Sequence, residues 1–134
     1  ALGLGQLERI DNILKSKIRL AKIYEELLSN NSSFKLQQIT NHTESSYWLF
    51  TIFLKDDLIK KRDSIISYLL SKGIESRPCF YPLHEMKPYS KYFRESLQSS
   101  SYLAYSGISL PTGIFTTKDE IEYVCFELNN SLII

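Results

Sequence analysis

A proline-stiffened segment carries the residues of this sequence whose types and spacing could bind a ligand. It reads ESRPCFYPLH over residues 75–84 and contains Arg77, Tyr81 and His84. An arginine can hold a carboxylate or a phosphate through two parallel hydrogen bonds, and tyrosine and histidine can hydrogen-bond to sugar hydroxyls or phosphate oxygens. Because proline fixes φ and removes a backbone donor, we expect an ordered, non-repetitive loop. The alternative is a loop whose polar groups satisfy only its own backbone.

Other combinations of reactive residues are weaker candidates for catalysis. Cys79 and His84 could be imagined as a nucleophile and its base, and Glu85 is adjacent to His84, but no spacing in the sequence identifies a triad. The acidic pairs at 56–57 and 119–120 stand where helices should begin, so capping explains them. The two cysteines and two histidines form no zinc motif. We therefore predict no catalytic, cofactor-binding or metal-binding residue in this chain.

The composition indicates one domain and argues against several classes of partner. The chain has 134 residues, of which 43% are hydrophobic, and this is enough for one core. Charged residues make up 23% and the formal net charge is +1, which gives no electrostatic basis for a nucleic-acid partner. No apolar run reaches the roughly 18 residues of a membrane span, and no signal peptide is recognisable. We expect a cytoplasmic protein with neither a nucleic acid nor a membrane as partner.

The elements that must position residues 75–84 can be predicted from periodicity. Apolar residues recur at three- and four-residue steps through residues 7–28, which predicts one long amphipathic helix over 1–28 that connects to another part of a protein. Strands are predicted at 34–39, 46–54, 74–77 and 108–110, and the apolar character of 46–54 on both faces indicates a central strand.

Further helices are predicted between these strands. One follows Asp57, buries Ile65, Ile66, Leu69 and Leu70, and ends at Gly73. Short helices are predicted around 89–94 and 100–106, and a capping box at Thr117 and Glu120 predicts the start of the last helix. The fold class is α+β, with helices packed on a small mixed or antiparallel sheet in a body formed by residues 34–134.

Four stretches in register resemble the DegT/DnrJ/EryC1/StrS family of aminotransferases, which use pyridoxal phosphate (PLP) and aminate nucleotide-linked keto-sugars. They are the RPxFYPLH block with Met86, Pro88 and Tyr89 after it, the ALGLGQLERID start, Arg62-Asp63 followed by Gly73-Ile74, and the SLPT stretch followed by Asp119-Glu120-Ile121 and Val124. The resemblance runs over essentially the whole chain and is to the C-terminal small domain of these fold-type I enzymes. The RPxFYPLH block is similar to enzymes of the perosamine-synthase type, which act on GDP-4-keto-6-deoxymannose.

This resemblance implies that residues 1–134 form a single small domain and that the large, PLP-binding N-terminal domain lies outside the sequence. The cofactor lysine belongs to that large domain, and Lys15, Lys60 and Lys72 match no cofactor motif. PLP is therefore expected in the complete enzyme and not on this chain, which should be inactive alone. The resemblance also implies that Tyr81 and His84 contact the sugar or its phosphates. It implies that Arg77 binds a phosphate or the carboxylate of the amino donor, expected to be glutamate. Cys79 departs from the bulky aromatic residue of many relatives.

Two alternatives remain open at this point. The chain could be a stand-alone, non-catalytic module for binding or dimerisation that derives from the same family. It could also be an unrelated α+β domain. An apolar stripe left exposed on the first helix would favour docking to a large domain, whereas a homodimer that buries this stripe would favour the module.

Overall fold

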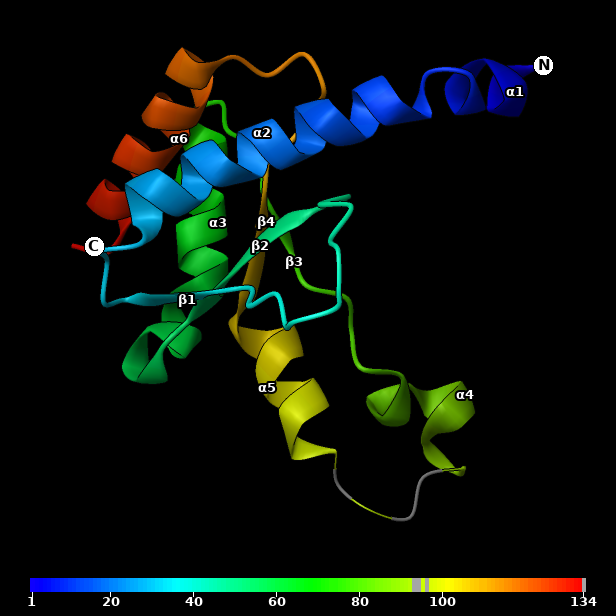
Figure 1. Cartoon of the computed structure of the whole chain (residues 1–134). Helices are drawn as coiled ribbons and strands as arrows, with labels where there is room; N and C mark the ends of the chain where they lie inside the picture. The colour runs from blue at the N-terminus through cyan, green and yellow to red at the C-terminus, as the bar shows by residue number, and fades with distance from the viewer. Residues whose placement is uncertain (93–94, 96, 134) are drawn as a thin grey trace.

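The computed structural model describes residues 1–92, 95 and 97–133, which form an α+β domain around a four-stranded sheet (Figure 1). The strands are β1 (Phe34–Leu36), β2 (Phe50–Leu54), β3 (Arg77–Pro78) and β4 (Gly107–Leu110). Their order is β1-β2-β4-β3, and every neighbouring pair is antiparallel. The predicted fold class is therefore confirmed, and of its two options the sheet takes the antiparallel one.

The core lies between one face of the sheet and three helices, α2 (Ile10–Leu28), α3 (Arg62–Ser71) and α6 (Lys118–Ser131). Residues opposite each other in an antiparallel pair point to the same face, and the register places Ile52 opposite Ile108 and Phe50 opposite Leu110. All four are buried, and the Tyr24 ring of α2 stacks on Phe50 with centroids 4.8 Å apart. On the opposite face the Thr51 and Ser109 hydroxyls hydrogen-bond to each other at 3.1 Å. Apolar burial on one face thus fixes the register of the sheet.

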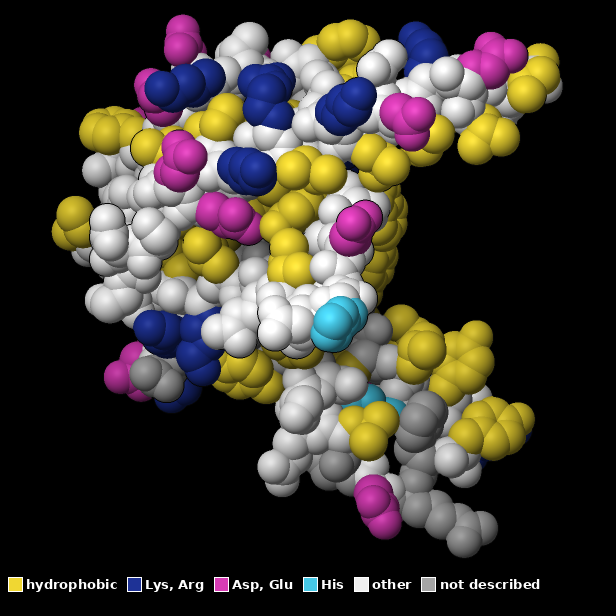
Figure 2. All heavy atoms as spheres, in the orientation of Figure 1, with side chains coloured by type: hydrophobic (Ala, Val, Ile, Leu, Met, Phe, Trp, Pro, Cys, Tyr) yellow, Lys and Arg dark blue, Asp and Glu magenta, His cyan; other side chains and the backbone are white. Residues whose placement is uncertain are grey.

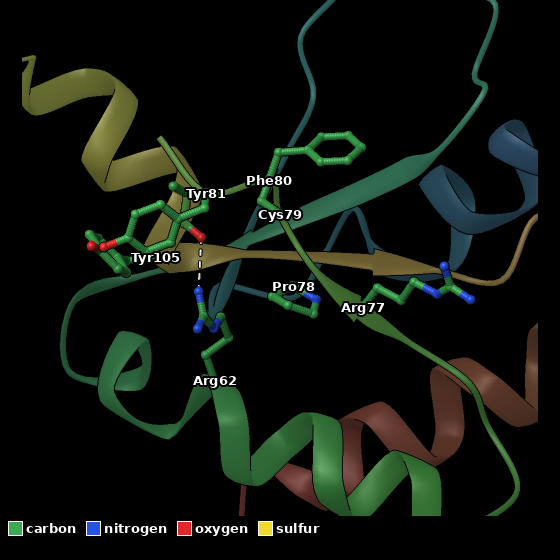
Figure 3. Close-up of a pocket in the computed structure, with 8 residues that line it drawn as sticks. Arg62, Arg77, Pro78, Cys79, Phe80, Tyr81 and Tyr105 are labelled. Atoms are coloured by element: carbon green, nitrogen blue, oxygen red, sulfur yellow. Dashed lines mark hydrogen bonds between the residues drawn. The ribbon is translucent and has the colours of Figure 1, made fainter. Parts of the chain in front are cut away.

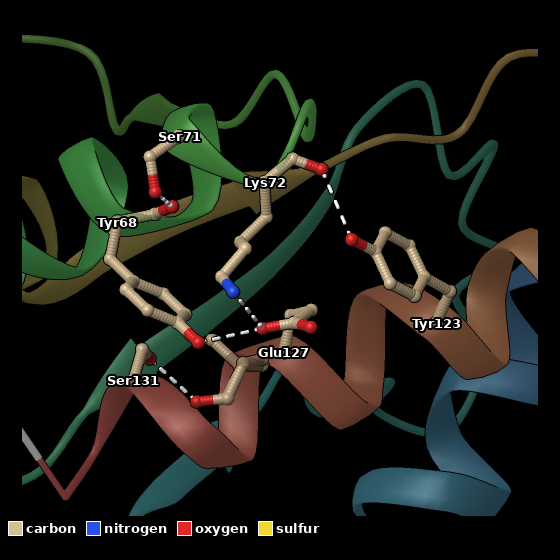
Figure 4. Close-up of polar contacts among 7 residues, drawn as sticks. Tyr68, Ser71, Lys72, Tyr123, Glu127 and Ser131 are labelled. Atoms are coloured by element: carbon tan, nitrogen blue, oxygen red, sulfur yellow. Dashed lines mark hydrogen bonds and ion pairs between the residues drawn. The ribbon is translucent and has the colours of Figure 1, made fainter.

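A buried polar contact joins α3 to α6 (Figure 4). The Glu127 side chain of α6 is only 9% exposed, and its Oε2 accepts a 2.7 Å hydrogen bond from the Tyr68 hydroxyl of α3. The Lys72 Nζ lies 4.0 Å from the same oxygen, and the Tyr123 hydroxyl donates to the Lys72 carbonyl. A carboxylate can be buried here because hydrogen bonding and a nearby cation compensate for the lost water.

The first helix differs from its prediction. Instead of one helix over 1–28, a short α1 (Leu2–Leu7) and α2 are separated by a break at Glu8 and Arg9. Arg9 leaves helical geometry with φ −114° and ψ 10°, and its Nε donates to the Gly5 carbonyl. The sequence places Gly3 and Gly5 in α1, where no residue is buried. Helix-weakening glycines and the lack of a surface to pack on account for the break.

Other elements agree with prediction in type and differ in length. β2 begins at Phe50 rather than at residue 46, because Tyr47 takes a left-handed conformation with φ 44° that ends the extended run. β1 stops at Leu36, and β3 is only Arg77–Pro78. The prediction that Leu70 is buried is wrong, since it is 63% exposed. Gly73 adopts φ 77° after α3, and the capping box between Thr117 and Glu120 is present, which confirms both predicted helix boundaries.

Three short elements follow β3. They are the 3-10 turn η2 (Leu83–Glu85), α4 (Lys87–Ser90) and α5 (Gln98–Ser106), and another 3-10 turn, η1 (Asp56–Lys61), precedes α3. The short helix predicted over 89–94 is represented by α4, while positions 93 and 94 lie outside the described residues. α4 and α5 lie at one end of the molecule, and α1 projects at the other (Figure 1). In the described part of the chain, every helix is too short or too polar to cross a lipid bilayer.

Candidate functional site

A cleft of about 420 Å³ lies where the chain leaves β3 and passes the end of α5 (Figure 3). It is lined by residues 77–81 (RPCFY), the first five of the predicted RPxFYPLH block, together with residues of α3 and α5. Its walls are formed by Arg62, Arg77, Pro78, Cys79, Phe80, Tyr81, Ala104 and Tyr105. The cleft therefore combines two guanidinium groups with aromatic rings, which suits an anionic ligand that also has a flat or hydroxylated part.

The loop after β3 is attached to the sheet by a close backbone contact. Arg77 pairs with Ser109 and Pro78 with Ile108 in the β3–β4 ladder, and the Cys79 amide donates to the Gly107 carbonyl at 3.1 Å. A Cβ added to Gly107 would lie 2.7 Å from the Cys79 Cβ, so only glycine fits at this position without a shift. The loop thus starts from a fixed point on the sheet.

Arg77 and Tyr81, both predicted to contact substrate, line the cleft at different places. The Arg77 side chain is 76% exposed and forms a 2.6 Å ion pair with Glu75. In Figure 3 its guanidinium extends away from Tyr81 and Tyr105. An exposed ion pair of this kind contributes little to stability, so Arg77 can exchange Glu75 for an anionic ligand at low energetic cost.

The third predicted residue, His84, lies in η2 and points to α5. Its side chain is only 9% exposed. The Nε2 atom is 3.1 Å from the Ser101 hydroxyl and 3.5 Å from Glu85 Oε1. The structure thus brings Arg77 and Tyr81 to one cleft, and His84 is not among the residues that line it.

Glu85 joins this part of the loop to α5. Its Oε1 accepts a 2.5 Å hydrogen bond from Ser101, and its Oε2 accepts one from the Tyr105 hydroxyl. These two hydrogen bonds, with a contribution from His84, hold the pKa of the Glu85 carboxyl below its ordinary value. The pKa of Tyr105 is raised, first by its hydrogen bond to Glu85 and further by the neighbouring Tyr81. The Tyr105 and Tyr81 rings meet edge to face, with centroids 6.3 Å apart.

Arg62, Ser101 and Tyr105 are site residues that were not predicted from the sequence. Arg62 begins α3, donates to the Ala104 carbonyl at 2.9 Å and pairs with Asp63 at 2.8 Å. In the sequence, Arg62 belongs to the Arg62-Asp63 pair that carries part of the family resemblance, but the resemblance implied no function for this pair. Ser101 and Tyr105 had the four-residue spacing that puts two side chains on one helix face, but nothing in the sequence connected them to residues 75–85.

The described residues of the cleft do not suit PLP. Binding of this cofactor by a transaminase needs a lysine for the aldehyde and an acid near the ring nitrogen, and the cleft-lining residues include neither. Nor do the described residues contain a group of three or more histidine, cysteine or acidic side chains arranged to hold a metal ion. As it stands, the cleft can bind and orient a ligand.

Lys17 of α2 is tied into the fold by contacts with backbone carbonyls. Its Nζ is half-buried and donates to the Thr112 carbonyl at 2.5 Å and the Trp48 carbonyl at 3.1 Å. Burial lowers its pKa. Lys17 thereby ties α2 to the segment that follows β4, so its ammonium is already occupied by backbone acceptors.

Comparison with known proteins identifies the family. Residues 1–129 match the sequence profile of the DegT/DnrJ/EryC1/StrS aminotransferase family. The GDP-perosamine synthase of Vibrio cholerae is 34% identical over 132 residues, and the GDP-perosamine synthase of Caulobacter vibrioides is 32% identical over 134 residues. The alignments cover 97% and 99% of this chain but only 35% and 36% of those proteins, so the chain spans about a third of their length.

Solved structures agree with this result at the level of the fold. The aminotransferase TlmJ from Streptoalloteichus hindustanus superimposes with a TM-score of 0.85 at 21% identity, over 98% of this chain and 35% of that chain. Helicobacter pylori PseC, an aminotransferase involved in the biosynthesis of pseudoaminic acid, gives a TM-score of 0.86 at 20% identity, over 97% and 35%. The chain described here belongs to the DegT/DnrJ/EryC1/StrS aminotransferase family.

Proposed function

We propose that this chain is the C-terminal small domain of a PLP-dependent aminotransferase that aminates a nucleotide-linked keto-sugar, with glutamate as the amino donor. The observation that carries the proposal is the combination of a family match over residues 1–129 with coverage of only about a third of the relatives' length. The part of these relatives that the chain does not match, about two thirds of their length, is enough for a large domain. The enzyme would work in the cytoplasm, where nucleotide sugars are made.

The two domains would divide the work. The large domain would hold PLP, which supplies the electron sink for transamination. The small domain would supply one wall of the site and would be inactive alone, because its cleft offers neither a lysine nor an acid for the cofactor. This division explains why the cleft has binding groups without a nucleophile and base in contact.

Within the small domain, Arg77, Tyr81 and His84 would serve the substrate in different ways. Tyr81 is 52% exposed in the cleft and is available to hydrogen-bond to a sugar hydroxyl or a phosphate oxygen. Arg77 would release Glu75 to bind a phosphate or the carboxylate of glutamate. His84 is 9% exposed, so it would reach a ligand only through its open edge. The similarity to GDP-perosamine synthases favours GDP-4-keto-6-deoxymannose as the sugar nucleotide.

Exposed apolar side chains support attachment to a large domain. Leu2, Leu4 and Leu7 of α1 are 90%, 61% and 65% exposed. Hydrophobic side chains are also visible on the projecting α1 and in the region of α4 in Figure 2. The ring of Trp48 stacks on Phe80 with centroids 6.1 Å apart, although Trp48 is 66% exposed and Phe80 70%. Exposed apolar side chains that lie together can mark an interface, here with the large domain, and a homodimer is the alternative occupant.

A chimeric enzyme tests the proposal. The matching third of the Vibrio cholerae GDP-perosamine synthase would be replaced by this chain, and amination of the keto-sugar nucleotide would be measured with glutamate. We expect turnover by the chimera and none by the isolated chain. Loss of the Arg77 or Tyr81 contact in Arg77→Ala and Tyr81→Phe should raise KM about tenfold, whereas Arg19→Ala, on an exposed part of α2, should not.

Two results would contradict the proposal. Turnover by the isolated chain would refute the division of labour between domains. Unchanged KM and kcat in both cleft variants of an active chimera would refute the assignment of Arg77 and Tyr81. Sedimentation of the isolated chain as a stable dimer, together with an inactive chimera, would favour the stand-alone module.

A further inference from the structure

Glu85 uses both of its carboxylate oxygens to hold α5. Ser101 and Tyr105 are four residues apart on that helix, so their side chains lie on the same face. Ser101 donates to Oε1 at 2.5 Å and Tyr105 donates to Oε2. Hydrogen bonds to a carboxylate are roughly twice as strong as those between neutral groups. Glu85 thus joins the loop to α5 by two hydrogen bonds, beside the contacts of His84 with Ser101 and of Tyr81 with Tyr105.

The segment that carries Glu85 has little regular structure of its own. It forms one 3-10 turn, η2, closed by a hydrogen bond from the Glu85 amide to the Pro82 carbonyl. The last ladder contact with the sheet before it is the bond from Cys79 to Gly107. Tyr81 therefore lies between two attachments, the sheet on one side and the Glu85 carboxylate on the other.

The contacts of Glu85 extend to the wall of the cleft. Tyr105, which donates to Glu85, meets the Tyr81 ring edge to face at 88°. Both tyrosines line the cleft (Figure 3). On the other side, His84 Nε2 shares the Ser101 hydroxyl with Glu85. These contacts connect Glu85 to Tyr81 through Tyr105 and to His84 through Ser101.

We propose that Glu85 is a positioning residue, which orients Tyr81 and His84 toward the substrate by fixing α5 against the loop of residues 79–88. The proposal rests on the function proposed above for the identity of the substrate, but the positioning itself is a property of this chain. Glu85 would not touch the ligand. It would set the geometry in which Tyr81 meets it, and misplacement of a binding group by about 1 Å can cost on the order of 100-fold in rate.

A spectroscopic experiment on this chain tests the positioning directly. Tyrosine labelled with 13C at Cζ would be titrated in the parent chain and in Glu85→Gln and Glu85→Ala, with Tyr81→Phe and Tyr105→Phe used for assignment. The control is Glu75→Gln, since Glu75 is exposed and bonds to Arg77. We expect the pKa of Tyr105 to fall toward the ordinary value of about 10 and the Tyr81 signal to move in Glu85→Ala. Glu85→Gln should give smaller changes, and Glu75→Gln none.

Kinetics in the full-length enzyme or the chimera provide the second readout. Glu85→Ala should raise KM for the sugar nucleotide about tenfold, with a smaller effect on kcat, and Glu85→Gln should restore part of the loss. Unchanged Tyr105 and Tyr81 signals in Glu85→Ala would overturn the proposal, whatever the chain binds. The proposal would also be overturned if the Tyr105 and Tyr81 signals shift in Glu85→Ala but the KM of the active enzyme does not change, although Tyr81→Phe impairs that enzyme. If the Tyr105 and Tyr81 signals shift in Glu85→Ala but Tyr81→Phe leaves KM unchanged, the positioning contact is supported and the proposed role of Tyr81 in binding is refuted.

Discussion

Gly107→Ala should loosen the attachment of the loop to the sheet by a purely steric effect. The Cβ of an alanine would lie 2.7 Å from the Cys79 Cβ and 2.8 Å from the Leu103 carbonyl oxygen. Gly107 has φ −80° and ψ 134°, an extended conformation open to any residue. Backbone strain therefore adds nothing, and the whole effect comes from the two close contacts.

The size of the effect follows from the cost of overpacking a buried position, about 1–3 kcal/mol. Unfolding entropy is about 2.1 cal/mol/K per residue, so for 134 residues a loss of about 2 kcal/mol lowers Tm by about 7 °C. Cys79 must also move, because the Leu103 carbonyl belongs to α5 and cannot give way without displacing that helix. The hydrogen bond from the Cys79 amide to the Gly107 carbonyl should weaken in consequence.

Thermal unfolding followed by circular dichroism measures the first effect, and hydrogen exchange at the Cys79 amide measures the second. The matched control is Gly3→Ala, where an added Cβ meets nothing within 4 Å. This control should keep or raise Tm, because alanine favours a helix over glycine by about 1 kcal/mol. A Gly107→Ala chain that is as stable as the parent, with unchanged exchange at Cys79, would refute the reasoning.

Three further predictions follow from other contacts. Tyr68→Phe removes the hydrogen bond to the buried Glu127 carboxylate and should lower the free energy of unfolding by about 1–3 kcal/mol, as measured by urea unfolding. In a Glu127→Leu background the same substitution should cost much less. Equal costs in the two backgrounds would contradict the coupling between Tyr68 and Glu127. Burial raises the pKa of Tyr47, with help from its bond to Glu25, to about 12, and burial with the charge of Glu122 raises that of Cys125 to about 12. The raised pKa values mean that the protonated forms of Tyr47 and Cys125 stabilise the folded state. Their contribution to the free energy of unfolding is complete below about pH 9 and is lost as pH rises through 12. A free energy of unfolding that stays constant from about pH 8 to about pH 12 would contradict the prediction. Finally, the isolated chain mixed with PLP should give no stoichiometric product on borohydride reduction, since Lys17 is held by carbonyls, and a reduced adduct on one lysine in mass spectrometry would show that the chain binds the cofactor itself.

Local sequence signals predicted the elements whose determinants lie close together in the chain. The capping box spans only the four residues from Thr117 to Glu120, and the conformation of Gly73 follows from its own lack of a Cβ. The interior position of β2 in the sheet was predictable from its apolar residues, although full burial alternates along the strand and lies on one face. The proline-rich loop of residues 75–84 and the candidates Arg77, Tyr81 and His84 could be found from residue types alone, and the family resemblance added their expected roles toward the substrate.

Contacts between distant residues could not be predicted in this way. The break between α1 and α2 depends on where the core ends, since Leu7 is exposed and Ala21 is buried on what the sequence presents as one stripe. Glu85 finds Ser101 and Tyr105 across 16 and 20 positions, and Lys17 finds Thr112 across 95. No periodicity encodes such pairings, because each depends on the packing of the intervening elements.

The edges of the sheet determine how other chains can associate with this domain. β1 and β3 are the outer strands, and they have only three and two residues. Pro78 in β3 has no amide hydrogen, so it offers no donor to an incoming strand. Short edges with a proline resist edge-to-edge association into aggregates. In the two-domain enzyme proposed above, this domain would therefore be exposed to solvent during synthesis with a low risk of intermolecular sheet growth, while the apolar residues of α1 would stay accessible for docking to the large domain.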